Sequence, residues 1–380
     1  SGDVFAGEVM DALKRKDQSL SFRGVGGAAI SCRAEGPDID MEAVNVLGFW
    51  EGLSAYAKVR EVSAQIAADI AASKPDVAVL VDAWGLSLRI AKKLRRLAPD
   101  IPIIKLIGPQ VWATRAGRAK TLAASVDHLI CLNAFEAPYY APYDLPVTIM
   151  GHPALSRPDL TGGQWTQTPP SKAPQDGEDT DTLLLLPGSR SAEIRRMAPP
   201  MIAAAKALRK LRPDMQICLA PADNVYQLFC DLHPDLPKDW TLIRGTEARF
   251  QAMAKARLAI SCSGTVNMEL ALSQAPIITG YRLSPLTYAA LKTFLFRADY
   301  ITLLNMAAGE EIIPELLQSA FRPDRIVETA LPLWDEGELR RSQIEAQNTA
   351  LKTLGLGARP AHDIAADTIL TYLRKRSGTP

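Results

Sequence analysis

The segment 183–193, LLLLPGSRSAE, constrains the fold of this chain more than any other stretch. Its four leucines form a short apolar run of the kind found in strands that are buried on both faces. Proline, glycine, serine and arginine follow, and helix-forming residues begin near Ala192. The segment therefore predicts a strand, a tight turn and a helix, which is the repeating unit of an α/β fold with a parallel sheet.

The turn in this segment is also a candidate ligand site. Ligands of open α/β sheets lie beyond the carboxyl ends of the strands, where the N–H groups of a helix N-terminus attract phosphate. A guanidinium such as that of Arg190 can hold two phosphate oxygens at once. Gly188, Ser189 and Arg190 therefore favour a pyrophosphate-binding turn, while an ordinary loop with a solvated arginine is the alternative that spacing leaves open.

Length and composition set the class of protein. With 380 residues, 47% of them hydrophobic and 22% charged, the chain has enough material for the cores of two domains. A net charge of +1 creates no overall field that would recruit nucleic acid. The five cysteines include no CxxC pair and the four histidines no HxxxH pair. We expect a reduced, cytosolic compartment, with neither a disulfide framework nor a metal site.

Strands and helices alternate along two stretches of the chain, which predicts two doubly wound, Rossmann-like domains facing a central cleft. The sequence opens with a helical segment where the alternation would place a strand, so the first strand is expected to be missing. Short apolar runs predict strands at 19–23, 76–81, 101–106, 128–132, 183–186, 215–220, 241–243, 258–261 and 277–280. The predicted divisions are an N-terminal domain at 1–155, a linker or insertion at 156–181, a second domain at 182–345 and C-terminal helices at 346–380.

A second turn of small residues follows the strand predicted at 258–261. Ser263, Gly264 and Thr265 can offer N–H and O–H groups to a diphosphate, and Glu269 can accept hydrogen bonds from ribose hydroxyls. In the alternative interpretation these residues only cap a helix, and Glu269 is a solvated acid in its first turn.

Together, the motifs of the chain resemble the lipid-A-disaccharide synthase family, whose members are glycosyltransferases of the GT-B architecture. The resemblance spans nearly the whole chain and depends on the order of the motifs rather than on any one of them. The motifs are SGD at 1–3, VLGFWEGL at 46–53, KPDVAVLVDA at 74–83, GPQVWATR at 108–115, GHP at 151–153, LLLLPGSRSAEI at 183–194, SCSGTVNMELAL at 261–272, PIITGYRLSPLTY at 276–288 and ADYITLLNMAAG at 298–309.

The resemblance implies an enzyme that transfers 2,3-diacylglucosamine from its UDP conjugate to 2,3-diacylglucosamine 1-phosphate, releasing UDP and a β-1,6-linked disaccharide. It implies a cytoplasmic protein bound peripherally to the inner membrane, and it allows a homodimer. Ser1 and Glu51 would face the acceptor. The UDP-sugar would be bound by residues of the second domain, namely Gly188, Ser189, Arg190, Ser263, Gly264, Thr265, Glu269 and Asn305.

An α-linked donor that gives a β-linked product requires inversion, so a general base must take the proton of the attacking hydroxyl. Asp82 is our candidate because it follows a predicted strand, although it could instead cap the next helix. No DxD pair follows a strand in the second half, so we expect no metal and no other cofactor. The segment 281–296 mixes apolar and basic residues and could lie at the membrane surface or in the core.

Several departures from the family pattern fall in the first domain, where the acceptor would bind. After Asp82 the family usually has Ala-Pro-Asp-Phe-Asn, but this chain has AWGLS at 83–87, without the second acid. VWATR replaces VWAWR, AFE replaces PFE, and Ser156 stands where an acid is usual. Three alternatives therefore stay open: a relative with another acceptor, a UDP-sugar epimerase, or an inactive UDP-binding homologue.

Overall fold

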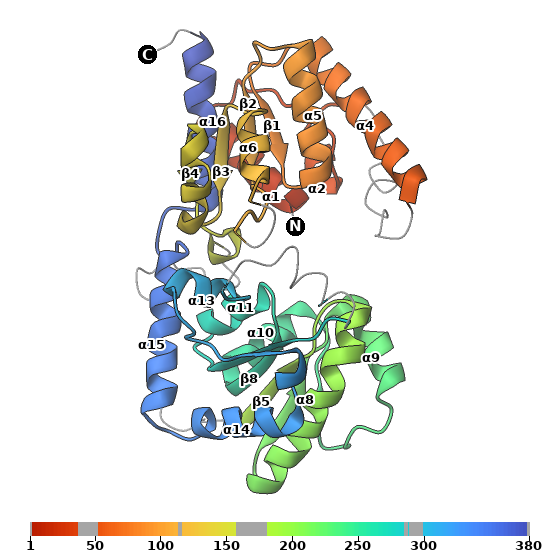
Figure 1. Cartoon of the computed structure of the whole chain (residues 1–380), viewed down its shortest axis with the longest axis vertical. Coiled ribbons are helices and arrows are strands. Elements are labelled where there is room, and N and C mark those ends of the chain that lie inside the picture. The colour runs from red at the N-terminus through yellow and green to blue at the C-terminus, as the bar shows by residue number, and fades with distance from the viewer. Residues whose placement is uncertain are drawn as a thin grey trace. The chain divides into compact units, whose positions relative to one another are not determined.

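The computed structural model describes residues 2–36, 52–112, 116–156, 181–284, 288 and 299–377. They belong to two compact units, each a parallel sheet with helices on both faces (Figure 1). Unit 1 consists of Ser1–Pro153 with Arg359–Pro380, and unit 2 of Ala154–Ala358. The last helix thus packs within unit 1. Most of the predicted linker, 157–180, lies outside the described residues.

Unit 1 is built on four parallel strands in the order β1-β2-β3-β4. Helices α1 and α16 cover one face of this sheet, while α4, α5 and α6 cover the other. The strands are β1 (Ala78–Val81), β2 (Ile103–Leu106), β3 (His128–Cys131) and β4 (Val147–Ile149). The helices are α1 (Gly2–Lys16), α2 (Ala28–Ser31), α4 (Gly52–Ser73), α5 (Trp84–Leu97), α6 (Arg118–Ala123) and α16 (Ala361–Ser377).

Unit 2 contains six parallel strands in the order β10-β9-β8-β5-β6-β7. One face packs against α8, α9 and α14, and the other is covered by α10, α11, α13 and α15. The strands are β5 (Thr182–Leu186), β6 (Gln216–Leu219), β7 (Thr241–Leu242), β8 (Ala256–Cys262), β9 (Ile277–Tyr281) and β10 (Glu315–Leu317). The helices are α8 (Ser191–Leu211), α9 (Tyr226–Leu232), α10 (Thr246–Lys255), α11 (Val266–Leu272), α13 (Leu303–Ala308), α14 (Pro323–Trp334) and α15 (Glu338–Thr353).

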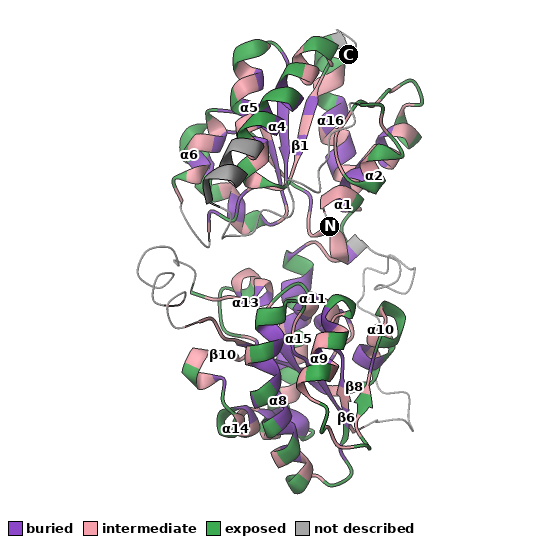
Figure 2. Ribbon diagram, turned by 90° about the vertical axis from the view of Figure 1, so that its right-hand side faces the viewer, coloured by how far each residue is buried: buried purple, intermediate pink, exposed green. Residues whose placement is uncertain are grey.

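Burial follows the apolar pattern of the sequence. All of β5 is buried, as expected for a run of leucines in the middle of a doubly covered sheet. In α5, Ile90, Ala91 and Leu94 are buried at helical spacing, whereas Lys92 and Arg96 are exposed. Figure 2 shows the same division, with buried residues on the strands and on the helix faces that meet them. Hydrophobic burial therefore fixes both sheets and leaves the loops at their ends for function.

Strand order in unit 2 places a topological switch point between β5 and β8. From β5 the chain first adds β6 and β7 on one side, and then crosses to β8 on the other. Ligands of open α/β sheets lie at such a point, beyond the carboxyl ends of the strands. The turns after β5 and β8 carry the motifs predicted to bind a diphosphate, so the topology brings both to one edge of the sheet.

Most predicted strands are confirmed, with ends that differ by one or two residues. The strand predicted at 19–23 is wrong: only an isolated bridge joins Arg23 to Glu35. Its neighbouring glycines belong instead to a turn that packs against Asp3, whose carboxylate accepts hydrogen bonds from Ala29 and Ile30. A Cβ on Gly27 would lie 2.7 Å from an oxygen of Asp3, so the glycine is needed for this contact.

Candidate active site

The turn between β5 and α8 is held by the buried carboxylate of Glu193. Its Oε2 atom accepts hydrogen bonds from the backbone N–H groups of Ser189 and Arg190, at 2.9 and 3.1 Å. Gly188 has a φ of +119°, and a Cβ there would lie 2.7 Å from that of Glu193. Only glycine suits both the backbone angle and the close approach. Two of the N–H groups that were expected to bind phosphate therefore already donate hydrogen bonds to the Glu193 carboxylate.

Arg190 presents its guanidinium outward from this turn. Its Nη1 atom lies 2.6 Å from Oε1 of Glu193, yet 75% of the side chain is exposed. The Tyr281 hydroxyl donates to the same Oε1 at 3.3 Å. The hydrogen bond to Glu193 raises the pKa of Arg190 further above its usual value. An anion at this turn would meet the remaining guanidinium N–H groups and the first N–H groups of α8, which have no intrahelical acceptor.

The turn between β8 and α11 lies at the other side of the switch point. Ser263 is fixed there, because its N–H donates to Gly280 O at 3.1 Å and its hydroxyl to Ile301 O at 3.4 Å. Gly264 and Thr265 are exposed, and Glu269 is half-buried in α11. The turn thus offers small exposed groups on a fixed base.

Asn305 lies inside unit 2 and makes its hydrogen bonds to the protein. Fully buried in α13, it donates from Nδ2 to Ile313 O at 2.8 Å and to Glu315 Oε1 at 2.9 Å, and it accepts from Ile313 N at 2.8 Å. The Glu315 carboxylate also accepts from the N–H groups of Ile301 and Thr302. Asn305 therefore ties α13 to β10 and fixes the segment that receives the Ser263 hydroxyl.

In unit 1, Asp82 follows β1 and is exposed at the carboxyl end of the sheet. Asp82 and Ala83 have φ values of +42° and +43°, a left-handed conformation that costs non-glycine residues about 1 kcal/mol or more each. Ala83 is the N-cap of α5, so the capping role considered for Asp82 is not the one it has. A Cβ on Gly2 would lie 3.2 Å from Cβ of Asp82, which places Asp82 beside the start of α1.

A buried lysine lies beneath this turn, and the sequence analysis missed it. Lys105 in β2 is only 1% exposed, and its ammonium donates to the carbonyl oxygens of Asp82 and of Leu80, the latter at 3.3 Å. Ser87 also donates to the Asp82 carbonyl, at 2.6 Å. Burial lowers the pKa of Lys105 to about 7, while the charge of Asp82 acts in the opposite direction. The sequence signal for this buried amine was a lysine within the otherwise apolar strand predicted at 101–106.

Two further acid–base groups, the buried Glu136 and the half-buried His152, lie at the same edge of unit 1. Burial raises the pKa of Glu136 to about 7, against hydrogen bonds from Asn133 that act to lower it. The carboxylate closes a capping box with Asn133, which gives it a structural function. Burial also lowers the pKa of His152 to about 4. The predicted acceptor residues Ser1 and Glu51 lie outside the described residues.

Within the described ranges, no three His, Cys, Asp or Glu side chains are grouped as a metal site would require. None of the helices in those ranges is both long and apolar enough to span a membrane. Most of the amphipathic segment at 281–296 lies outside the described residues.

Comparison with known proteins links this geometry to a family. The model of the lipid-A-disaccharide synthetase family matches residues 1–369. The lipid-A-disaccharide synthase of Rhodospirillum centenum is 31% identical over 378 residues, which cover 99% of this chain and 93% of that protein.

Solved structures share the fold at low sequence identity. The UDP-GlcNAc 2-epimerase of Neisseria meningitidis, bound to UDP-GlcNAc, aligns with a TM-score of 0.58 and 14% identity over 97% of this chain and 96% of that chain. MurG of Acinetobacter baumannii aligns with a TM-score of 0.56 and 15% identity over 98% and 96%. These likenesses confirm the GT-B fold with its two Rossmann-like units.

Proposed function

Since the chain belongs to the lipid-A-disaccharide synthetase family, it is a glycosyltransferase, and we propose how its two units divide the reaction. The proposed donor is UDP-2,3-diacylglucosamine, and the proposed acceptor is 2,3-diacylglucosamine 1-phosphate. The products are the β-1,6-linked disaccharide and UDP. Family membership favours this transfer over epimerisation, because the likeness to epimerases is one of fold alone.

The observation that carries the donor assignment is the position of two turns at one switch point. Arg190, after β5, and Ser263 to Thr265, after β8, flank the place where α/β sheets bind nucleotides. In our proposal the guanidinium of Arg190 and the Ser189 hydroxyl bind the diphosphate. Glu193 holds the turn in shape, and Glu269 accepts from the ribose. Asn305 acts through the protein, by positioning the loop that fixes Ser263.

In the proposed reaction, Asp82 is the general base. The acceptor 6-hydroxyl oxygen attacks C1 of the donor sugar, and its proton goes to the Asp82 carboxylate. The bond between C1 and the diphosphate oxygen breaks, and its electron pair leaves with UDP. Arg190 would stabilise the negative charge that builds on the diphosphate. Exposure of Asp82 and its position at the end of β1 support this role.

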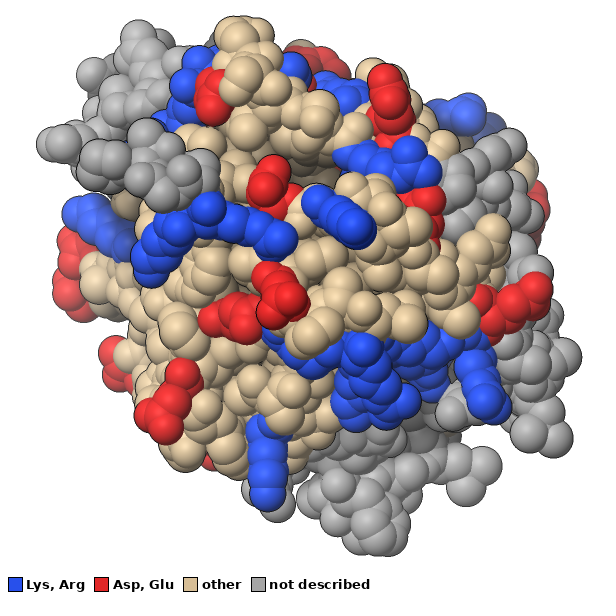
Figure 3. All heavy atoms as spheres, turned by 90° about the horizontal axis from the view of Figure 1, so that it is seen from above, with Lys and Arg blue, Asp and Glu red and all other residues tan. Residues whose placement is uncertain are grey.

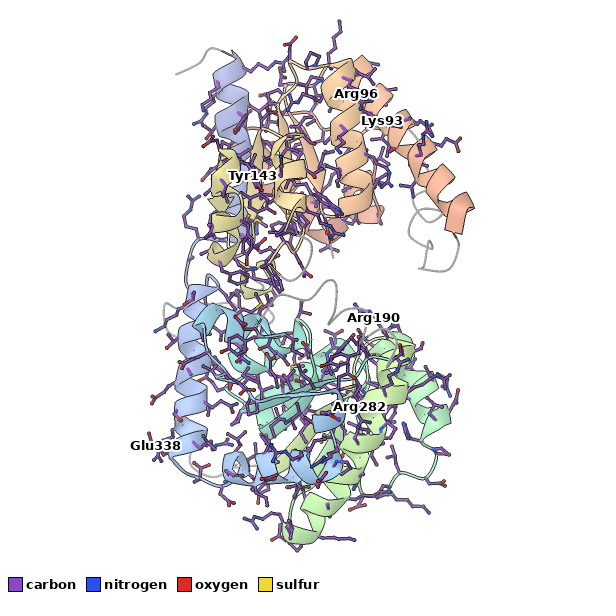
Figure 4. The ribbon with its side chains drawn as sticks, in the orientation of Figure 1. Lys93, Arg96, Tyr143, Arg190, Arg282 and Glu338 are labelled. Carbon is purple, nitrogen blue, oxygen red and sulfur yellow. The ribbon has the colours of Figure 1, made fainter. Side chains whose placement is uncertain are left out.

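We place the membrane-facing surface of unit 1 on α5. Lys92 and Arg96 are exposed along this helix, and Leu97 beside them is 58% exposed. Figure 3 shows a group of Lys and Arg side chains on the face seen from above, and Figure 4 labels Lys93 and Arg96 on α5. Basic groups with an apolar neighbour suit anionic headgroups. The enzyme would thus work at the cytoplasmic face of the inner membrane, where its acylated substrates reside.

One incubation separates the candidate functions. The protein is given UDP-diacylglucosamine with diacylglucosamine 1-phosphate, and both products are measured by mass spectrometry. Formation of disaccharide and UDP in equal amounts supports the proposal. Release of UDP only with a different acceptor would replace the acceptor, a 2-epimerised UDP-sugar would indicate an epimerase, and UDP binding without turnover would indicate an inactive homologue.

A further inference from the structure

A second basic site in unit 2 lies beside α8 rather than at the turn that begins it. Three arginines, Arg195, Arg196 and Arg282, line a cavity of about 440 Å³. The first two come from α8, and the third follows β9. Figure 4 shows Arg190 where α8 begins and Arg282 beside a later part of that helix. The lining of the cavity includes none of the residues of the donor turn, Gly188 to Arg190, so the two are distinct.

The charges of this cavity are not neutralised by an ion pair within the described chain. Arg190, at the donor turn, forms an ion pair with Glu193. Arg195, Arg196 and Arg282 form no ion pair with any residue that the structure describes. Like charges that share a cavity repel one another, and an anion between them would remove this cost. The arrangement therefore indicates a ligand with negative charge.

The walls of the cavity hold these groups in place. Nε of Arg282 donates to Gln318 O at 3.1 Å, which leaves its two terminal nitrogens for a ligand. Gln318 has a φ of +52°, uncommon for a residue other than glycine. Pro199 and Pro200 also line the cavity, and their rings are rigid. A planar guanidinium held at one nitrogen is suited to an oxyanion with two or more acceptor oxygens.

The other polar residues of the lining bear on the rest of the ligand. The side chain of Gln318 carries both a donor and an acceptor for hydroxyl groups. Ser319, also in the lining, can donate or accept. The site therefore matches a phosphate attached to a polyol better than a bare anion.

We propose that this cavity, which we name the α8 arginine cavity, binds a phosphate ester of a polyol independently of UDP. A glycerol phosphate has this chemistry, whether it is free in solution or the headgroup of an anionic lipid. The proposal does not depend on the transfer reaction, because it concerns different side chains from those assigned to the donor.

The test measures two probes at saturating UDP, so that the donor turn is filled. Calorimetry with sn-glycerol 3-phosphate gives the soluble arm. Sedimentation with phosphatidylglycerol vesicles, against phosphatidylcholine vesicles, gives the lipid arm. The Arg195→Gln/Arg196→Gln variant should bind the relevant probe about tenfold or more weakly, since it loses two charge-assisted interactions with the anion. Lys206→Gln, an exposed position later in α8, is the matched control and should bind like the wild type.

The outcomes are distinct. Loss of glycerol 3-phosphate binding in the arginine variant supports a soluble ligand, and loss confined to phosphatidylglycerol vesicles supports a lipid headgroup. Equal binding of both probes by the variant and the wild type overturns the proposal, as does the absence of binding of either probe to the wild type. Should the double variant unfold, Arg282→Lys keeps the charge but not the planar fork and should bind less tightly. Repeating the soluble arm without UDP shows whether the cavity binds even if the donor assignment fails.

Discussion

The buried amine of Lys105 should make the stability of unit 1 depend on pH in a way that one substitution removes. Burial lowers its pKa from 10.5 to about 7, and the charge of Asp82 offsets only part of this effect. The folded state therefore binds fewer protons than the unfolded state from about pH 7 to pH 10.5. The free energy of unfolding rises with pH through this window, by up to about 5 kcal/mol at about 1.4 kcal/mol per pKa unit.

The substitution Lys105→Met keeps an unbranched side chain of similar length and removes the titrating group. At neutral pH the variant should be at least as stable as the wild type, because the cost of burying a charge is gone. At high pH it should be less stable, because the carbonyl oxygens of Leu80 and Asp82 lose a donor that the neutral lysine still provides. The stability of the wild type relative to the variant should therefore increase as pH rises.

Urea unfolding at a series of values from about pH 6 to pH 10 measures this difference. Amide hydrogen exchange of peptides from β1 and β2 should be the reporter, because the two units need not unfold together. The exposed Lys92→Met variant is the control and should keep the slope of the wild type. If Lys105→Met also kept that slope, the lysine would not be the titrating group and the argument from its burial would be refuted.

Four further changes test the proposed roles. Asp82→Asn should lower kcat by about 10²- to 10⁴-fold with unchanged UDP affinity, and retained turnover would remove it as the base. Arg190→Ala should weaken UDP binding about tenfold or more in calorimetry, whereas an unchanged Kd would place the diphosphate elsewhere. Asn305→Ala should destabilise unit 2 by about 2–4 kcal/mol in urea; weaker UDP binding at unchanged stability would instead indicate direct contact with the donor. Lys92→Glu/Arg96→Glu should weaken binding to phosphatidylglycerol vesicles about tenfold or more, and equal binding would exclude α5 as the membrane surface.

The central strands and the edge strands β1 and β7 could be predicted from the sequence, but the edge strands β4 and β10 could not. β5 contains four consecutive leucines and β8 the apolar run 258–260, because helices cover both faces of these strands. β4 and β10 are edge strands of three residues each, and parts of both remain accessible to solvent. Such strands have too few apolar residues for a pattern to appear. Their pairing is set by the neighbouring strand rather than by their own sequence.

Of the candidate site, the sequence predicts only those residues whose role follows from their position just after a strand. Arg190 and Asp82 each come just after an apolar run, so the sequence indicates that they lie at the end of a sheet. Which groups their neighbours bind depends on tertiary contacts. Glu193 accepts hydrogen bonds from N–H groups that were expected to bind phosphate. The hydrogen-bond partners of the Asn305 side chain lie eight and ten residues away in the chain. Local patterns do not report contacts of this kind.

The same reasoning explains why the β1–α5 turn can tolerate its departures from the family pattern. The second acid of that pattern is absent, yet Asp82 and Ala83 keep a left-handed backbone that a free loop would not hold. Ser87 and Lys105 both donate to the Asp82 carbonyl from inside the unit. These hydrogen bonds are made to the backbone carbonyl of Asp82 and not to its carboxylate. They therefore fix the turn while leaving the side chain of Asp82 exposed. A general base needs this combination, since its position must be fixed while its oxygens remain open to the acceptor.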